Sequence, residues 1–167
     1  MKVKIIFNHI VKVRVKYIME IKKFEINKAE GIKINVKQTE HIHGGKYVGE
    51  KLNGKAHGEG TYFYEDGSKY VGQWKDDMMD GDGIFTWNSG EKYIGSWSKD
   101  LKHGYGTYTW PDGESYTGQW KEDLKHGDGI YIWSDGGKYI GQYTDDVEAG
   151  HGIYIEPNGQ VKYFPEN

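Results

Sequence analysis

The stretch 70-YVGQWKDDMMDGDGIFTWNSGEK-92 decides the fold of this chain. In its first half, Tyr70, Gly72 and Trp74 alternate with other residues, so they share one face of an extended strand. In its second half, Phe85 and Trp87 alternate in the same way. Acidic residues lie at the tip between the two halves, and a glycine-containing turn closes the stretch. The stretch therefore predicts a β-hairpin followed by a chain reversal.

The same pattern occurs five times at an interval of 23 residues. Each unit begins with a tyrosine, has glycine at its third, twelfth and fourteenth positions, and ends near another glycine. Such self-similarity is typical of a solenoid in which each repeat contacts only its neighbours. We expect an all-β fold, a single-layer twisted antiparallel meander of about ten strands. Its five repeats are residues 47–69, 70–92, 93–115, 116–138 and 139–161.

The regular glycines are complementary to the regular aromatic residues. A ring on one strand lies flat over a neighbouring strand only where that strand has no side chain in the way. The opposite face of the strands carries β-branched residues such as Val71, Ile94 and Thr109, which suit a half-exposed sheet.

These residues, in the form Tyr-x-Gly-x-Trp followed by His-Gly-x-Gly-x-Tyr and Asp-Gly, resemble the membrane occupation and recognition nexus (MORN) repeat over residues 47–161. Departures are Lys51 and Tyr143 in place of Trp, and Asp80 in place of His. The resemblance implies a scaffold of cytoskeletal or membrane-associated assemblies, in some cases dimerising through terminal repeats. It also implies that such arrays can regulate lipid kinases or methyltransferases.

Composition and charge divide the chain into two parts. The 167 residues include no cysteine, which excludes disulfides and thiolate chemistry and favours a cytoplasmic protein. The MORN resemblance implies that it is peripheral to a membrane or the cytoskeleton. Residues 1–46 hold 11 Lys and Arg against 4 Glu, whereas residues 47–167 hold 11 Lys against 21 acids. The formal net charge of −3 thus hides a basic segment and an acidic array.

The basic segment, residues 1–46, fits the repeat poorly and is interpreted as a degenerate β cap. Alternation around Val13 and Tyr17 favours a strand, although a helix satisfies the same spacing. Residues 162–167 are expected to be a C-terminal tail. Basic residues of the segment are the candidates for binding anionic lipid, because each surface Lys or Arg adds about 1 kcal/mol of attraction: Lys2, Lys4, Lys12, Arg14, Lys16, Lys22 and Lys23.

No residue pattern indicates catalysis. The sequence contains no nucleophile elbow, Walker loop or His-Glu-x-x-His motif, so we expect neither an enzyme nor a cofactor. His57, His103 and His126 occupy equivalent positions, but one repeat is about 10 Å, too far for a shared ion. A structural role is favoured over a metal site. The acidic tips, such as Asp76-Asp77, are interpreted as solvated turn charges.

The aromatic face is the candidate for binding a protein partner, because a single-layer sheet has no second layer to cover it. The alternative is that most of these rings are simply the core. Besides the scaffold, the alternatives are a lipid-binding membrane tether, a regulatory subunit of a separate enzyme, and a homodimer; nucleic acid is not expected. The candidates for partner contact are Tyr70, Trp74, Trp87, Tyr93, Trp97, Trp110, Tyr116, Trp120 and Trp133.

Overall fold

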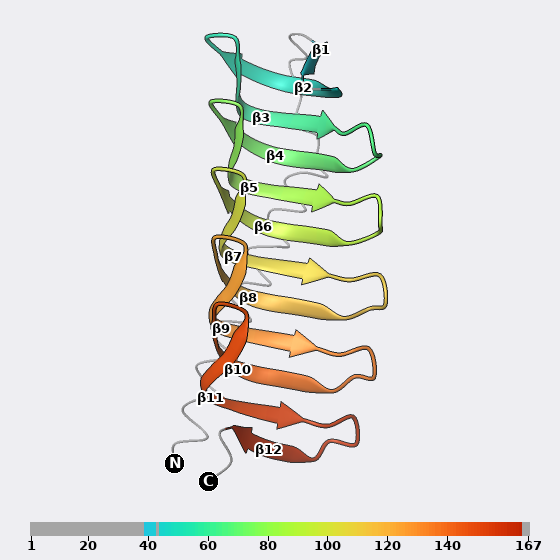
Figure 1. Cartoon of the computed structure of the whole chain (residues 1–167), viewed down its shortest axis with the longest axis vertical. Helices are drawn as coiled ribbons and strands as arrows, with labels where there is room; N and C mark the ends of the chain where they lie inside the picture. Colours follow the sequence, from blue (N-terminus) through green and yellow to red (C-terminus); the bar gives the residue numbers. More distant parts are fainter. Residues whose placement is uncertain (1–38, 43, 165–167) are drawn as a thin grey trace. The chain divides into compact units, whose positions relative to one another are not determined.

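The structure, a computed structural model, describes residues 39–42 and 44–164, and these form one sheet of twelve antiparallel strands in chain order (Figure 1). The all-β meander predicted from the repeats is confirmed. Within those ranges no helix is long and apolar enough to cross a membrane. The strands are β1 (Thr39–Ile42), β2 (Gly45–Leu52), β3 (Lys55–Phe63), β4 (Lys69–Lys75), β5 (Met78–Thr86), β6 (Lys92–Ser98), β7 (Leu101–Thr109), β8 (Ser115–Lys121), β9 (Leu124–Ile132), β10 (Lys138–Thr144), β11 (Val147–Ile155) and β12 (Val161–Phe164).

Two kinds of turn alternate along the sheet. The two-residue tips have positive φ at both positions, 51° and 72° at Asp76 and Asp77, which matches the twist of a tight hairpin. The longer turns close with the Trp87 N–H donating to the Glu91 carbonyl (3.0 Å) and the Gly90 N–H donating to the Trp87 carbonyl (3.0 Å). Gly90 has φ 102°, a conformation that favours glycine.

Each repeat buries a tyrosine across a pair of facing glycines. Gly95 of β6 is paired with Gly106 of β7, and the ring of Tyr93 lies over both. The Tyr93 hydroxyl donates a hydrogen bond to the Ser96 carbonyl (3.0 Å) and its side chain is fully buried. The predicted complementarity of ring and glycine is therefore present. It recurs at Tyr47, Tyr70, Tyr116 and Tyr139.

The buried tyrosines and tryptophans form one continuous column. The Tyr93 ring meets Trp97 of its own repeat at 5.0 Å and Trp120 of the next repeat at 5.5 Å, both edge to face. Tyr143, in the last repeat, takes the tryptophan's place and meets Tyr116 at 5.0 Å. The core therefore lies within a single layer, and ring contacts link each repeat to the next.

Each hairpin bends at a β-bulge, and its tip turns toward the preceding hairpin (Figure 1). An aspartate at the tip binds that hairpin: the Met79 N–H donates to Asp100 Oδ1 (2.7 Å), and the Asp100 N–H donates to the Met79 carbonyl (3.0 Å). The prediction that the tip acids are solvated turn charges describes Asp100 only in part, because this exposed aspartate also accepts a hydrogen bond from a backbone N–H. The other members of this aspartate ladder are Asp77, Asp123 and Asp146.

The ends of the sheet extend beyond the five repeats. Residues 39–42 of the expected cap form β1, paired with β2. Residues 162–164, expected in a C-terminal tail, belong instead to β12, which pairs with β11 because its backbone continues the ladder. The rest of the basic segment, with its strand and helix alternatives, lies outside the described residues.

Candidate functional site

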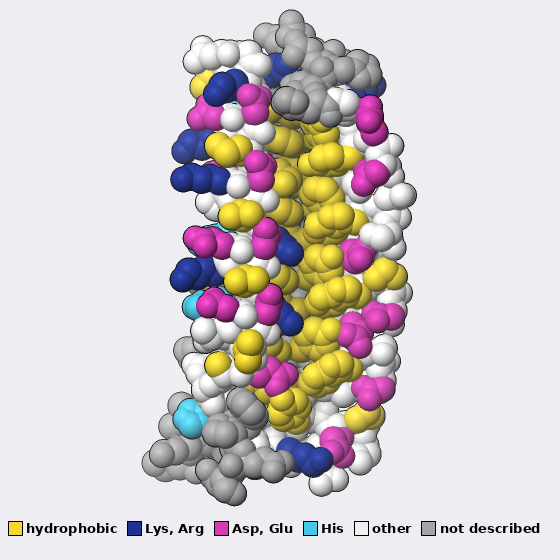
Figure 2. Space-filling model, in the orientation of Figure 1, with side chains coloured by type: hydrophobic (Ala, Val, Ile, Leu, Met, Phe, Trp, Pro, Cys, Tyr) yellow, Lys and Arg dark blue, Asp and Glu magenta, His cyan; other side chains and the backbone are white. Residues whose placement is uncertain are grey.

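A row of half-buried aromatic rings runs beside the buried column on the same face of the sheet. Figure 2 shows this face as a band of hydrophobic side chains between two columns of charged side chains. These rings pack against the core but keep part of their surface open. The aromatic row consists of Tyr64, Trp87, Tyr108, Trp110, Tyr131, Trp133 and Tyr154.

The turns position the tryptophans of this row. Trp87, the first residue of its turn, packs at a tilt against Phe85 of the preceding strand (4.4 Å between ring centres) and against Tyr108 of the next repeat (5.2 Å). Tyr108 in turn lies 4.6 Å from Trp110. Neighbouring rings are tilted by 32–49° in these contacts, so they cover much of one another's faces. Because a tyrosine ring contacts the indoles on both sides in this way, ring edges are the main surface that remains for a ligand.

Carboxylates border the row on its turn side. The Tyr131 hydroxyl donates a hydrogen bond to Glu114. Burial and then Glu114 and Asp112 raise the pKa of Tyr131 well above its ordinary value, and burial and then Glu91 raise the pKa of Tyr108. Glu91, Asp112 and Glu114, which we call the acidic rim, therefore lie close enough to the rings to act on them electrostatically.

Lysines lie on the tip side of the row. The Lys102 ammonium is 4.8 Å from the centre of the Trp120 ring, 5.0 Å from that of Tyr108 and 3.8 Å from Asp123 Oδ1. Burial lowers its pKa. One repeat later, the Lys125 ammonium lies 5.2 Å from the Tyr131 ring. Both cations lie over ring faces, and the Lys102 ammonium is also paired with Asp123 of the aspartate ladder.

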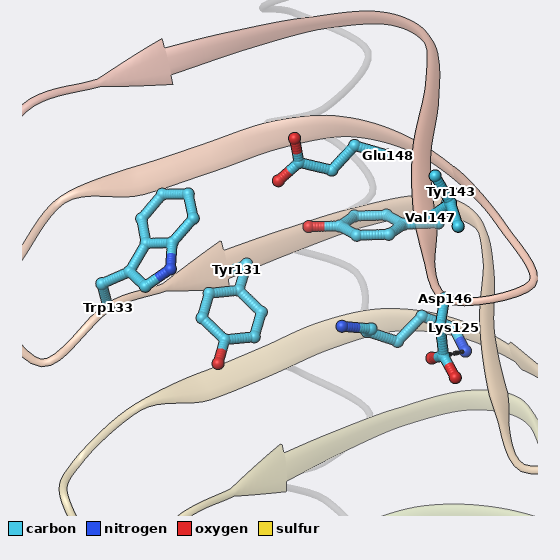
Figure 3. Close-up of a pocket in the computed structure, with 7 residues that line it drawn as sticks. All are labelled: Lys125, Tyr131, Trp133, Tyr143, Asp146, Val147 and Glu148. Carbon is cyan, nitrogen blue, oxygen red and sulfur yellow. Dashed lines mark hydrogen bonds between the residues drawn. The ribbon is translucent and has the colours of Figure 1, made fainter.

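The row widens into a hollow of about 590 Å³ near the last repeat. Figure 3 shows Tyr131 and Trp133 along one side of it and the Lys125 chain reaching toward them from the other. Burial raises the pKa of Glu148, and the Tyr154 hydroxyl donates a hydrogen bond to its carboxylate. The lining mixes aromatic and charged groups, which suits a polar, extended ligand. It consists of Lys125, Tyr131, Trp133, Tyr143, Asp146, Val147 and Glu148.

The nine predicted contact residues divide into two groups. Tyr70, Tyr93 and Tyr116 have no exposed surface, and the exposed fractions of Trp74, Trp97 and Trp120 are only 7%, 5% and 5%. These six belong to the core, because each is enclosed by the glycine pairs and by its ring neighbours, so the structure does not bring them to an accessible surface. The three that remain open to a partner are Trp87, Trp110 and Trp133.

Other residues of the site were not among the sequence candidates. Tyr64 had a signal, since it precedes Trp87 by one repeat, and Tyr154 follows Tyr131 by one repeat. No sequence signal indicated Lys102, Lys125 or the acidic rim, because their position beside the rings depends on the bend of the hairpins.

Other predicted sites stay apart from the row. His57, His103 and His126 lie on β3, β7 and β9. In the part of the chain that the structure describes, no three His, Asp or Glu side chains gather in a way that could hold a metal ion. The lipid candidates Lys2, Lys4, Lys12, Arg14, Lys16, Lys22 and Lys23 lie outside the described residues.

Comparisons with known proteins agree with the repeat boundaries. The family model for the MORN repeat matches at residues 47–69, 70–92, 93–115, 116–138 and 139–161. A solved structure of the SAS-4 (dCPAP) TCP domain in complex with a proline-rich motif of Ana2 (dSTIL), from Drosophila melanogaster, is similar with 13% identity and a TM-score of 0.38, over 75% of this chain and 88% of that one. That likeness is too distant to extend to binding. A search of curated proteins found no match.

Proposed function

Because this chain belongs to the MORN repeat family, we propose that it is a non-catalytic scaffold that binds an extended segment of a protein partner along its aromatic row. The observation that carries this proposal is the row itself, seven rings left half-open on a face with charged borders. Aromatic surface of this kind, edged by polar groups, is typical of sites where proteins bind one another.

The buried column and the aromatic row have different roles, the first in folding and the second in binding. The tyrosine and tryptophan column supplies the core, with its tyrosines fully enclosed. The row lies outside it, so folding alone does not require three tryptophans at turn positions. Tryptophan is the residue most enriched among those that dominate binding energy. Trp87, Trp110 and Trp133 are therefore the residues on which partner binding should depend.

The repeat also supports an extended ligand. Equivalent rings recur once per repeat, about 10 Å apart, which is twice the strand spacing. A partner segment that follows the row would meet the same surface several times. Its affinity would then depend on the number of repeats contacted rather than on one deep pocket.

The test is capture of partners by two forms of the full chain. One carries Trp87→Ala, Trp110→Ala and Trp133→Ala; the control carries Tyr105→Ala, which removes an aromatic ring from the opposite face, where Gln119 bonds its hydroxyl. Circular dichroism checks that both are folded. Partners retained by the control and lost by the triple variant would support the proposal, whereas equal retention by both would refute it.

The charge of residues 1–46 favours a second candidate, a peripheral tether to anionic membranes. The acidic array would be repelled by such a surface, so the binding would depend on the basic segment. Self-association through the last hairpins and regulation of a separate enzyme stay predictions from the resemblance. A cytoplasmic location is likewise a proposal from the absence of cysteine.

A further inference from the structure

The hollow near the last repeat is lined by seven residues, each of which stands 23 positions after a residue of the preceding unit. Four of the seven have the same identity as that earlier residue: a lysine, a tyrosine, a tryptophan and an aspartate. The other three are smaller or shorter, and they leave the space that forms the hollow. These differences are Tyr143 for Trp120, Val147 for Leu124 and Glu148 for Lys125.

The Lys125 ammonium lines this hollow without an anionic partner. One repeat earlier, the equivalent Lys102 ammonium lies 3.8 Å from Asp123 Oδ1. Among the residues that the structure describes, Lys125 belongs to no ion pair and its ammonium has no hydrogen-bond acceptor. An ammonium carries three N–H donors, so Lys125 offers unused donors to the hollow. Its closest neighbours of note are three rings with centres 5.2–5.8 Å away, those of Tyr116, Tyr131 and Tyr143.

The Glu148 carboxylate lies on the other side of the hollow (Figure 3). It accepts a hydrogen bond from the Tyr154 hydroxyl, and within the described ranges it too belongs to no ion pair. Burial raises its pKa, although the charge of Lys125 acts in the opposite direction. A carboxylate has about four acceptor sites, so Glu148 is partly desolvated and still lacks donors.

The hydroxyl of Tyr143 lies between these two charges and has no hydrogen-bond partner among the described residues. Tyr143 is only 3% exposed. Figure 3 shows its hydroxyl pointing into the hollow, with Glu148 on one side and Lys125 on the other. A buried hydroxyl without a partner is unfavourable, so this group indicates a ligand that supplies one.

Resting on the proposed function, we infer that the hollow binds the carboxamide side chain of a glutamine or asparagine in the partner segment. The carbonyl oxygen accepts from the Lys125 ammonium and the Tyr143 hydroxyl, and the NH₂ group donates to Glu148. The C=O and one N–H of an amide point in opposite directions, as the two sides of the hollow require. The plane of the amide packs against the rings of Tyr131 and Trp133.

The opposite charges on the two sides select a neutral, dipolar group. A guanidinium or ammonium would pair with Glu148 but would be repelled by Lys125. A carboxylate would pair with Lys125 but would be repelled by Glu148 and by an array that holds 11 Lys against 21 acids. A carboxamide is attracted on both sides, and it costs less to desolvate than either ion.

NMR titration of the full chain with four small probes tests this choice, and the Trp133 indole N–H is the reporter. The probes are the N-acetyl methylamides of glutamine, glutamate, arginine and alanine, which all carry the same two backbone amides. We expect the glutamine probe to bind at least about tenfold more tightly than the other three, because each of those lacks a hydrogen bond to a charged group. Tighter binding of the arginine or glutamate probe, or equal binding of the alanine probe, would overturn the inference.

Variants that restore residues of the preceding repeat assign the binding to the hollow. Tyr143→Trp and Glu148→Lys should each weaken the glutamine probe at least about tenfold, since the first fills the hollow and the second removes the acceptor. Both introduce the side chain found at the equivalent position one repeat earlier, so the fold should be retained. The matched control Gln142→Ala changes an exposed side chain that alternates to the opposite face, and it should leave binding unchanged. Undiminished binding to the Glu148→Lys variant would contradict the assignment.

A library of displayed peptides, selected on the full chain, separates this inference from the proposed function. Binders that contain glutamine or asparagine and lose affinity for the Glu148→Lys variant would support both. Binders that need Trp110 but bind the Glu148→Lys variant equally well would overturn the inference and leave the scaffold function standing. If no binder depends on Trp110 or on Glu148, both fail.

Discussion

Replacing Gly106 by alanine tests the packing that allows a single layer to have a core. An ideal Cβ at this position would lie 2.2 Å from the Tyr93 hydroxyl oxygen and 2.3 Å from its Cζ. Non-bonded carbon atoms settle at about 3.5–4.0 Å, so the ring must move by more than about 1 Å. It has little room, because Trp97 and Trp120 hold its edges and it is fully buried.

The cost follows from how the clash is relieved. Ejecting the ring would expose about 150–250 Å², which at about 25 cal/mol per Å² is about 4–6 kcal/mol. Partial accommodation by neighbours costs about 1–3 kcal/mol. Gly106 is paired with Gly95 on one side and with Gly118 on the other, so its backbone has little freedom to move away from the ring. We therefore expect a loss of stability between these two limits, about 3–5 kcal/mol.

Urea unfolding followed by circular dichroism measures this loss of stability. The matched control is Gly136→Ala, whose Cβ meets nothing within 4 Å; at φ 87° it should cost only about 1–2 kcal/mol. In a Tyr93→Ala background, Gly106→Ala should cost less than about 1 kcal/mol, because the ring is gone. If its cost is the same with and without the ring, the steric reasoning is refuted.

Three further predictions concern the tips, the phenols and the basic segment. Asp100→Ala should lower the free energy of unfolding by about 1–2 kcal/mol, because the Met79 N–H loses its hydrogen-bond acceptor. Asp100→Asn should retain most of this stability, because its amide oxygen can still accept the bond. An equal loss in the turn control Lys99→Ala would contradict a stabilising role of the Asp100 hydrogen bond. Burial raises the pKa of Tyr47 and Tyr139 to about 12 while unfolded tyrosine ionises near 10, so their stabilisation is complete below pH 10 and is lost as the pH rises toward 12. The tyrosinate absorbance that Tyr47→Phe and Tyr139→Phe each remove should therefore appear together with unfolding, and its appearance in the folded protein at pH 10 would contradict this. The full chain should sediment with anionic vesicles at low salt and a chain of residues 47–167 should not, whereas sedimentation of both would exclude the basic segment as the tether.

The fold could be predicted from the sequence because each repeat carries the whole pattern of strand, turn and ring positions. Alternation of Tyr70, Gly72 and Trp74 defines a strand face, and the 23-residue interval defines what each strand pairs with. The register of glycine against glycine then follows from the space that the ring needs. These are local and nearest-neighbour relations, which explains why no long-range information was required.

The site could be predicted only in part. Period-two alternation puts Trp74 and Trp87 on the aromatic face alike, but it does not show that Trp74 is enclosed by Tyr47 and Tyr70 while Trp87 sits at an open turn. The difference arises from the bend at the bulge, where the tip approaches the preceding hairpin. The hydrogen bonds of the aspartate ladder could not be predicted for the same reason. In the sequence, Asp100 does not differ from other acidic turn residues, and only the structure places it within hydrogen-bond distance of the Met79 N–H.

The most direct test of the account is NMR of the six tryptophan indole N–H groups during titration of the full chain with its tightest-binding peptide segment. Substitution of each tryptophan by phenylalanine assigns the signals. If the aromatic row is the binding surface, the signals of Trp87, Trp110 and Trp133 shift in a saturable manner while those of Trp74, Trp97 and Trp120 stay in place. Binding that shifts none of the first three, or mainly the buried three, would contradict the claim that the aromatic row is the binding surface.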